Sequence, residues 1–202
     1  MSEPFVLEPA AFLDLWQEKL FLGQEFLTWL WIVSEINGNL LNIKPTASAG
    51  PSGENFPSAI ELWFESRLTL EAGEGGHKKS VTCQTPGTEW DEAHTALRRG
   101  KKLTRGQLKI RAEDKEWGLS LSADTLVPQG VKFPKTFAAG EEEEDTEIGR
   151  FMERVALMSE LVAIIAALYH QFLEVRLSSE WEMKELPRLN RWLEEQKQKI
   201  NE

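Results

Sequence analysis

The chain has 202 residues, 41% of them hydrophobic, and carries a formal net charge of −10 at pH 7. This is enough for one sizeable domain with a buried core. The acidic total excludes a protein that coats nucleic acid over its whole surface, because non-specific affinity grows with the number of phosphates that basic residues neutralise.

The N-terminal residues MSEPFVLEPA lack the basic and apolar regions of a secretory signal. The single cysteine, Cys83, excludes an internal disulfide, and no apolar run approaches the ~20 residues that cross a bilayer. We therefore expect a cytoplasmic protein without a membrane-spanning segment.

The first predicted element is a helix over residues 22–36. Apolar residues recur there at helical spacing, and Asn37-Gly38 supplies a stop. We expect this helix to be buried on more than one side. Residues 44–58, KPTASAGPSGENFPS, are rich in Gly, Pro, Ser and Ala without apolar periodicity, which predicts a mobile loop.

A β-hairpin and a short helix follow. Residues 59–70 place apolar side chains on alternate positions, which is the pattern of a half-buried strand, and residues 77–85 predict the strand that returns. The short helix begins near Thr88, with acidic residues in its first turn, and ends at Gly100.

A second hairpin contains a basic block over residues 98–111, RRGKKLTRGQLKIR. This block holds seven Lys or Arg residues and no acidic one, whereas the other 188 residues carry 16 basic and 33 acidic residues. Strands are predicted over 102–111 and 117–123, with a further edge strand over 131–133. The basic side chains expected on the solvent face of the first strand are Arg105, Lys109 and Arg111.

A long helix is predicted to begin in the acidic run GEEEEDTE over 140–147, because carboxylates suit a helix N-terminus. From Ile148 the apolar residues follow a strict heptad spacing, so we expect this stripe to lie under other elements or against a partner subunit. The positions of the stripe are 148, 151, 155, 158, 162, 165, 169 and 172.

The sequence therefore predicts one α+β domain over residues 1–178. In it, antiparallel β-hairpins form a sheet that packs with a long C-terminal helix and a buried N-terminal helix. Residues 179–202 are expected to form an amphipathic C-terminal tail, whose apolar side includes Trp181 and Trp192.

Few residues are candidates for catalysis. The chain has three histidines and one cysteine, and it lacks the HExxH, CxxC, GxSxG and GxxxxGK[ST] motifs. With 33 acidic residues, some carboxylates lie close together by chance, so their number alone does not indicate a magnesium site. We expect a protein that is not an enzyme and that holds no metal or other cofactor.

Several features occur in a particular order. A short helix ends at Gly100-Lys101, a strand begins near Thr104-Arg105, a hairpin leads to Val131-Lys132-Phe133, and a terminal helix contains residues 158–161. This order resembles the C-terminal half of the bacterial recombination-associated RdgC family. The segment LGQEFLTWLWIVSE over 22–35 also looks like a signature of one branch of that family.

The resemblance implies a non-enzymatic protein that binds duplex DNA, forms a ring-shaped dimer around it and restrains the RecA recombinase. It places Lys101, Lys102 and Arg105 near the DNA-facing side. With the rest of the basic block, the expected phosphate contacts are Arg98, Arg99, Lys101, Lys102, Arg105 and Lys109. Such contacts are independent of base sequence, and a DNA-bound chain would be associated with the nucleoid.

The same resemblance implies a partner, because the chain is too short to hold the family's N-terminal half. We therefore expect a homo-oligomer, or a second protein that supplies that half, with exposed apolar surface as the contact. The residues expected to contact a partner are Phe26, Trp29, Trp31, Trp181 and Trp192. The alternative function is a protein-interaction and oligomerisation subunit that has lost DNA binding.

Overall fold

The computed structural model describes residues 22–45, 56–72, 79–84, 90–135 and 143–200. Its helices and strands are, in chain order, α2 (Gly23–Ile36), β1 (Leu40–Asn42), β2 (Ala59–Ala72), β3 (Lys79–Gln84), α3 (Asp91–Arg98), β4 (Lys102–Ala112), β5 (Lys115–Ser122), β6 (Pro128–Lys132), α4 (Glu143–Arg176), the π-helical turn η2 (Trp181–Glu185) and α5 (Leu186–Ile200). Most of the expected loop over 44–58, and the expected helix start at Thr88, lie outside the described residues.

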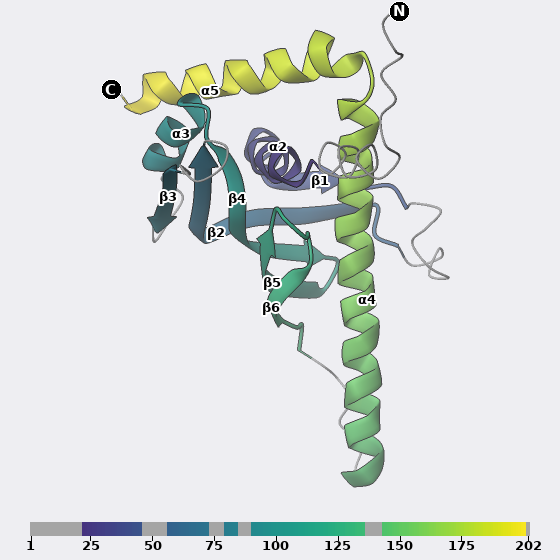
Figure 1. Cartoon of the computed structure of the whole chain (residues 1–202). Coiled ribbons are helices and arrows are strands. Elements are labelled where there is room, and N and C mark those ends of the chain that lie inside the picture. Colours follow the sequence, from purple (N-terminus) through teal and green to yellow (C-terminus); the bar gives the residue numbers. More distant parts are fainter. Residues whose placement is uncertain (1–21, 46–55, 73–78, 85–89, 136–142, 201–202) are drawn as a thin grey trace, which may run out of the picture.

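The strands of the described residues form one six-stranded antiparallel sheet (Figure 1). Its order is β1-β2-β4-β5-β6, and β3 pairs with β2 on the same edge as β1, further along that strand. On β2 the alternate residues Ile60, Leu62 and Leu70 are at most 1% exposed, because they point to the covered face of the sheet. Both predicted hairpins, β2-β3 and β4-β5, are confirmed, and the fold is α+β as predicted.

Two strand boundaries differ from the prediction. The turn between β4 and β5 contains only Glu113 and Asp114, whereas the predicted strands left residues 112–116 between them, and Glu113 adopts a positive φ of 55°. β6 begins at Pro128, three residues before the edge strand predicted over 131–133. Proline is tolerated there because β6 is an edge strand and Pro128 is its first residue.

The helix α2 lies on one face of the sheet and is buried nearly all round, as predicted. It contacts β2 and β4 on one side and α4 and α5 on others, and Figure 1 shows it enclosed between the sheet and α5. A helix covered in this way needs apolar residues on more than one side. The face of the sheet opposite α2 is here called the open face.

The burial of α2 corrects the expectation that its aromatic residues contact a partner. Phe26, Trp29 and Trp31 lie in the core, and so does Trp192 of α5. Trp31 stacks on the ring of His94 in α3, with centroids 5.4 Å apart, and Trp192 contacts both of these rings. The four aromatic side chains are covered by the chain's own helices, so they are not available as a contact surface.

The C-terminal amphipathic segment forms η2 and α5, and α5 crosses over α2 and α3 (Figure 1). Its apolar side chains Leu189 and Trp192 belong to the same core as the sheet. Trp181, which was also expected at a partner surface, is half-buried between Phe172 at 6.1 Å and Arg176 at 5.0 Å from its ring centroid. The segment is therefore packed on the domain and does not extend from it.

The long helix α4 is confirmed, but its heptad stripe is not buried throughout. Ile148, Phe151 and Val155 are 69%, 65% and 44% exposed, whereas the later stripe position Phe172 is buried. A straight helix has 3.6 residues per turn, so a heptad stripe drifts by about 20° per heptad around it. The stripe therefore begins on the solvent side of α4 and reaches the core only near the C-terminal end.

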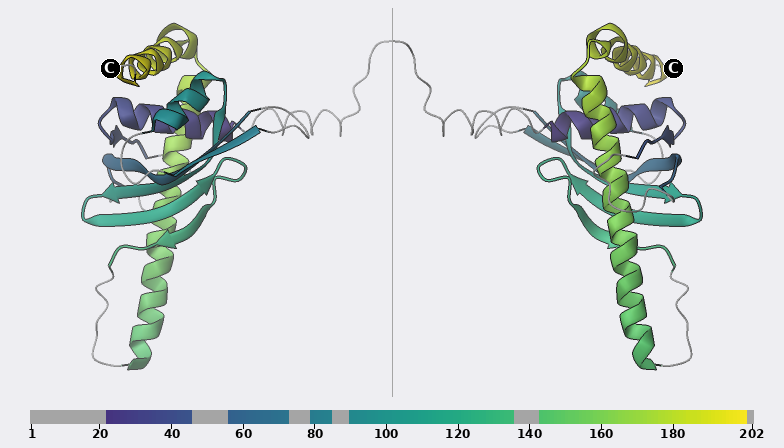
Figure 2. Two further views of the ribbon diagram at one scale, coloured as in Figure 1. Left: turned by 90° about the vertical axis from the view of Figure 1, so that its left-hand side faces the viewer. Right: turned by 90° about the vertical axis from the view of Figure 1, so that its right-hand side faces the viewer.

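A different set of residues packs α4 on the domain, namely Leu157, Leu161, Ile164 and Leu168. The N-terminal half of the helix extends beyond the sheet, as both views of Figure 2 show. Among the described helices, none joins enough length with enough apolar character to cross a bilayer.

Candidate nucleic-acid interface

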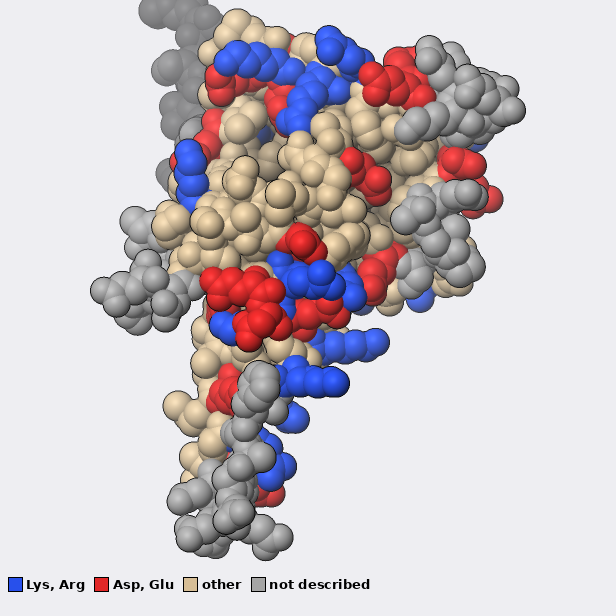
Figure 3. All heavy atoms as spheres, turned by 180° about the vertical axis from the view of Figure 1, so that it is seen from behind, with Lys and Arg blue, Asp and Glu red and all other residues tan. Residues whose placement is uncertain are grey.

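The side chains of the basic block do not form one continuous strip. Arg98 and Arg99 close α3 and Lys101 follows them, whereas the other three expected phosphate contacts lie on β4. Arg98 Nη2 donates to Thr95 Oγ1 of its own helix at 3.1 Å, and Arg99 is exposed. Figure 3 shows, from behind, that acidic and basic side chains lie against each other at several places.

Lys102 turns towards the helices. Its Nζ lies 3.2 Å from Glu25 Oε1 of α2, and Arg176 Nε of α4 donates to the other oxygen of this carboxylate at 2.8 Å. Burial alone would raise the pKa of Glu25, but hydrogen bonds from Arg176 and Lys102 outweigh it and hold the pKa below its usual value. Lys102 is therefore engaged within the chain, where it ties β4 to α2.

We expect Glu25→Gln to lower the free energy of unfolding at pH 7 by about 1–2 kcal/mol, because it leaves two cations beside a neutral amide at a partly exposed site. The folded-state pKa is lowered, so this stabilisation is present above the unfolded value of 4.5 and is lost as the pH falls through the folded value. Urea titrations at pH 7 and at pH 3 measure it. The difference between the two proteins should shrink at pH 3, and an unchanged difference would contradict the assignment.

Lys109 stands on the open face as predicted, but carboxylates neutralise it and its neighbour. Its Nζ lies 2.9 Å from Glu116 of β5, and Arg111 pairs with Glu116 and with Glu61 of β2 at 3.1 and 3.0 Å. Both cations also lie over the ring of Trp63, at 5.9 and 5.2 Å from its centroid. Hydrogen bonds from Lys109 and Arg111 hold the pKa of Glu116 below its usual value. This end of β4 therefore carries paired charges.

Arg105 has neutral hydrogen-bond partners. Its Nε donates to Ser120 Oγ at 3.0 Å and its Nη2 donates to Gln129 Oε1 at 2.9 Å. Neither partner offsets the positive charge of the guanidinium. Within the part of the chain that the structure describes, no ion pair joins Arg105 to a carboxylate. Of the three expected contacts on β4, Arg105 is therefore the one best placed to receive an external anion.

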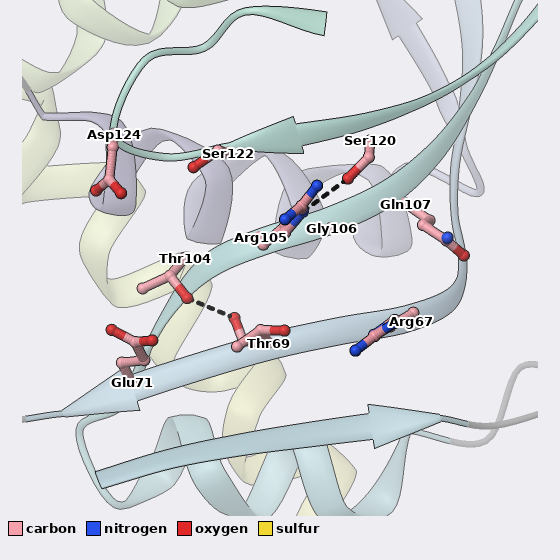
Figure 4. A pocket seen from close by; sticks show the side chains of 10 residues that line it. All are labelled: Arg67, Thr69, Glu71, Thr104, Arg105, Gly106, Gln107, Ser120, Ser122 and Asp124. Atoms are coloured by element: carbon pink, nitrogen blue, oxygen red, sulfur yellow. Dashed lines mark hydrogen bonds between the residues drawn. The ribbon is translucent and has the colours of Figure 1, made fainter. Parts of the chain in front are cut away.

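Arg105 lies in a hollow of about 490 Å³ on the open face (Figure 4). A second arginine, Arg67 of β2, lines the same hollow, and hydroxyl and amide side chains surround the two. The lining residues come from β2, β4, β5 and the turn after β5, and they are Arg67, Thr69, Glu71, Thr104, Arg105, Gly106, Gln107, Ser120, Ser122 and Asp124.

The hollow has ends of opposite charge. Figure 4 shows Arg67 and Gln107 at one end and Glu71 and Asp124 at the other, with Arg105 between them. An anionic chain is attracted to the first end and repelled by the second. Guanidinium, hydroxyl and amide groups are common donors to phosphate oxygens. The arrangement therefore suits a phosphate backbone that crosses β2 and β4 at the end of the hollow that holds Arg67 and Gln107.

Arg67, Ser120 and Gln129 are absent from the set of site residues expected from the sequence. Arg67 precedes the buried Leu68, so strand alternation alone places its side chain on the open face, and the same argument applies to Ser120 beside Leu121. The missing information was the pairing of β2 with β4, which places Thr69 opposite Arg105 and so brings Arg67 and Arg105 to the same hollow.

Other reactive groups do not gather near this hollow. Among the described residues, no three or more His, Cys, Asp or Glu form a group that could hold a metal ion. Burial, reinforced by Glu92, raises the pKa of the Cys83 thiol, which makes it a poor nucleophile. His94 is buried among aromatic rings, and His170 is exposed beside Glu174 at 3.4 Å.

The fold and the site define an α+β protein whose antiparallel sheet is covered by helices on one face and is open and polar on the other. No protein-family model matches the sequence, and no curated protein matches it significantly. The RdgC resemblance therefore stays a hypothesis.

Proposed function

We propose that this chain is a non-enzymatic subunit that binds duplex DNA without regard to base sequence and modulates homologous recombination. One observation carries the binding: Arg67 and Arg105 line the same hollow of the open face, among hydroxyl and amide side chains. Within the described residues, neither forms an ion pair with a carboxylate. The role in recombination rests on the resemblance to the RdgC family.

The site supports phosphate contact rather than base reading. Arginine, serine and glutamine donate to phosphate oxygens, and these contacts carry no sequence information. The two arginines lie on the broad face of a sheet, whereas base reading in the major groove uses an inserted helix or a narrow two-stranded ribbon. Lys102 and Lys109 contribute only after exchanging their carboxylate partners for phosphate.

Replacing Arg105 with glutamate tests the proposal. We expect the affinity for a short duplex of random sequence to fall at least about tenfold at low salt, because a phosphate contact becomes a repulsion. Arg191→Glu is the matched control, since this exposed residue of α5 lies away from the open face and its replacement changes the net charge equally. Fluorescence anisotropy with labelled DNA measures both variants.

The salt dependence gives an independent check. With two to three phosphates engaged, the slope of log K against log salt concentration should be about −2 to −3. Arg67→Glu should remove about one phosphate contact, so the slope should become less negative by about 0.9. Absence of duplex affinity at low salt, or equal losses for Arg105→Glu and Arg191→Glu, would contradict DNA binding through this face.

A protein-interaction subunit is the second candidate, and the ion pairs favour it. Two of the expected phosphate contacts, Lys102 and Lys109, are already held by Glu25 and Glu116. The other basic residues of the block then dock an acidic partner. Joint replacement of Lys101, Lys102 and Arg105 by glutamate separates the candidates: it abolishes retention on immobilised duplex if the chain binds DNA, and it changes only the co-purifying proteins if it does not.

A further inference from the structure

The helix α4 has two apolar faces, and the described residues cover only one of them. Leu157, Leu161, Ile164 and Leu168 pack on the domain. The opposite face, here called the α4 stripe, consists of Ile148, Phe151, Met152, Val155 and Val162, which are 69%, 65%, 59%, 44% and 48% exposed.

The α4 stripe runs along the helix axis on one side. Positions 148, 152, 155, 159, 162 and 166 are separated alternately by four and three residues, which averages to the helical repeat of about 3.6. The small residues on this line, Ser159 and Ala166, are exposed as well, and they allow a second helix to approach closely. Figures 1 and 2 show that the first half of α4 stands clear of the other described elements.

The area of the stripe is large for a monomer. With these exposures the five side chains present on the order of 500 Å² of apolar surface. Monomeric proteins rarely expose a contiguous apolar patch larger than a few hundred Å². One side of a standard protein interface buries about 800 Å². The α4 stripe is therefore of the size that forms the apolar centre of an interface, with polar side chains around it.

The charged residues beside the α4 stripe indicate which partner packs against it. The helix begins with the acidic sequence EEDTE, and Arg150 and Arg154 follow within two turns. Figure 3 shows basic side chains along this projecting part of the molecule. Glu147 and Arg154 are both exposed and lie seven residues apart, hence on the same side of the helix. The part of the stripe from Ile148 to Val155 is thus flanked by an acidic residue at its start and a basic residue at its end.

A second copy of the same helix can pair its charges with these two residues in only one direction. In antiparallel order, Glu147 of each copy lies beside Arg154 of the other, and two-fold symmetry makes this contact twice. In parallel order the two acidic helix starts lie side by side and repel each other.

We infer that two copies of this chain form a symmetric dimer in which their α4 stripes pack together in antiparallel order. This inference is independent of the proposed DNA binding, since the stripe and the open face share no residue.

Light scattering after size exclusion, at tens of micromolar chain, tests the dimer. The native chain should show twice the mass of one chain. Phe151→Glu and Val155→Glu should raise the dissociation constant at least about tenfold, because each places a charge in the apolar centre. Val127→Glu is the matched control, since Val127 is also exposed but lies outside the stripe. Circular dichroism melting verifies that the variants fold.

Charge reversal tests the direction of packing. Glu147→Arg and Arg154→Glu should each weaken the dimer, and the double variant should restore it, because the reversed charges again face each other. A double variant no stronger than the singles overturns the antiparallel order.

Cysteine linking tests the same direction without altering charge. Phe151 lies close to the proposed two-fold axis, whereas the two Val162 residues of an antiparallel dimer are roughly 35 Å apart. Oxidation should therefore link two copies of the Phe151→Cys variant and leave Val162→Cys unlinked. The buried Cys83 is present in both variants, so it does not affect the comparison. Linked Val162→Cys indicates parallel packing and overturns the proposed order.

Three results overturn the dimer itself. The first is that the native chain is monomeric and the stripe variants melt at the same temperature as the native chain. The second is a monomer whose melting temperature falls with Phe151→Glu, since another segment of the same chain then covers the stripe. The third is a dimer that the stripe variants leave intact, since its interface then lies elsewhere.

Discussion

Replacing Trp31 with alanine is expected to lower the free energy of unfolding by about 3–5 kcal/mol, the range for deleting a large buried aromatic side chain. Trp31 is 0% exposed, and its ring centroid lies 5.4 Å from that of His94, 6.3 Å from that of Trp90 and 6.4 Å from that of Trp192. The side chain therefore joins α2, α3 and α5 at one point. A cavity there cannot be closed by the movement of one neighbour, because protein interiors are close-packed.

Urea denaturation followed by circular dichroism measures this loss. Trp31→Phe is the matched control, because Trp31 Nε1 has no hydrogen-bond partner among the described residues, so this variant loses packing volume alone. We expect it to cost about 1–2 kcal/mol. Trp181→Ala, at a half-buried position, should also cost less than Trp31→Ala. Equal small losses at Trp31 and Trp181 would mean that Trp31 lies at the surface.

The position of Trp31 shows how far periodicity in the sequence predicts this fold. Burial of one face selects apolar residues at every second position of a strand and at every third or fourth position of a helix. This pattern predicted β2 and α2 to within two residues at each end. Periodicity identifies a buried side chain without identifying what buries it. The apolar surface of α2 therefore suggested a partner, although α5, far along the chain, covers it.

The sequence also predicted the candidate site only in part. Alternation along β4 correctly placed Arg105 and Lys109 on the open face. Their different electrostatic states depend on the neighbouring strands, because Glu116 of β5 neutralises Lys109 while Ser120 of the same strand leaves Arg105 charged. Arg67 comes from β2, and β3 and α3 separate β2 from β4 in the sequence. A count of basic residues along one strand therefore predicts the face that they occupy, but not the net charge of that face.

The adjacent residues Leu161 and Val162 test how α4 is oriented on the domain. Leu161 is 0% exposed and Val162 is 48% exposed, because successive residues of a helix are rotated by about 100° around its axis. We expect Leu161→Ala to lower the free energy of unfolding by about 2–5 kcal/mol, and Val162→Ala to lower it by less than about 1 kcal/mol. Urea denaturation measures both variants. The chain concentration should be low enough to keep the protein monomeric, since association adds to the apparent stability.

The order of the two losses would be reversed if the heptad stripe were packed on the domain, because Val162 belongs to that stripe and Leu161 does not. If the strict heptad face were the one packed on the domain, Val162→Ala would be the more destabilising variant. The drift of a seven-residue repeat around a straight helix would then not describe α4. The α4 stripe would then lose Val162 to the core, and its exposed apolar residues would end at Val155.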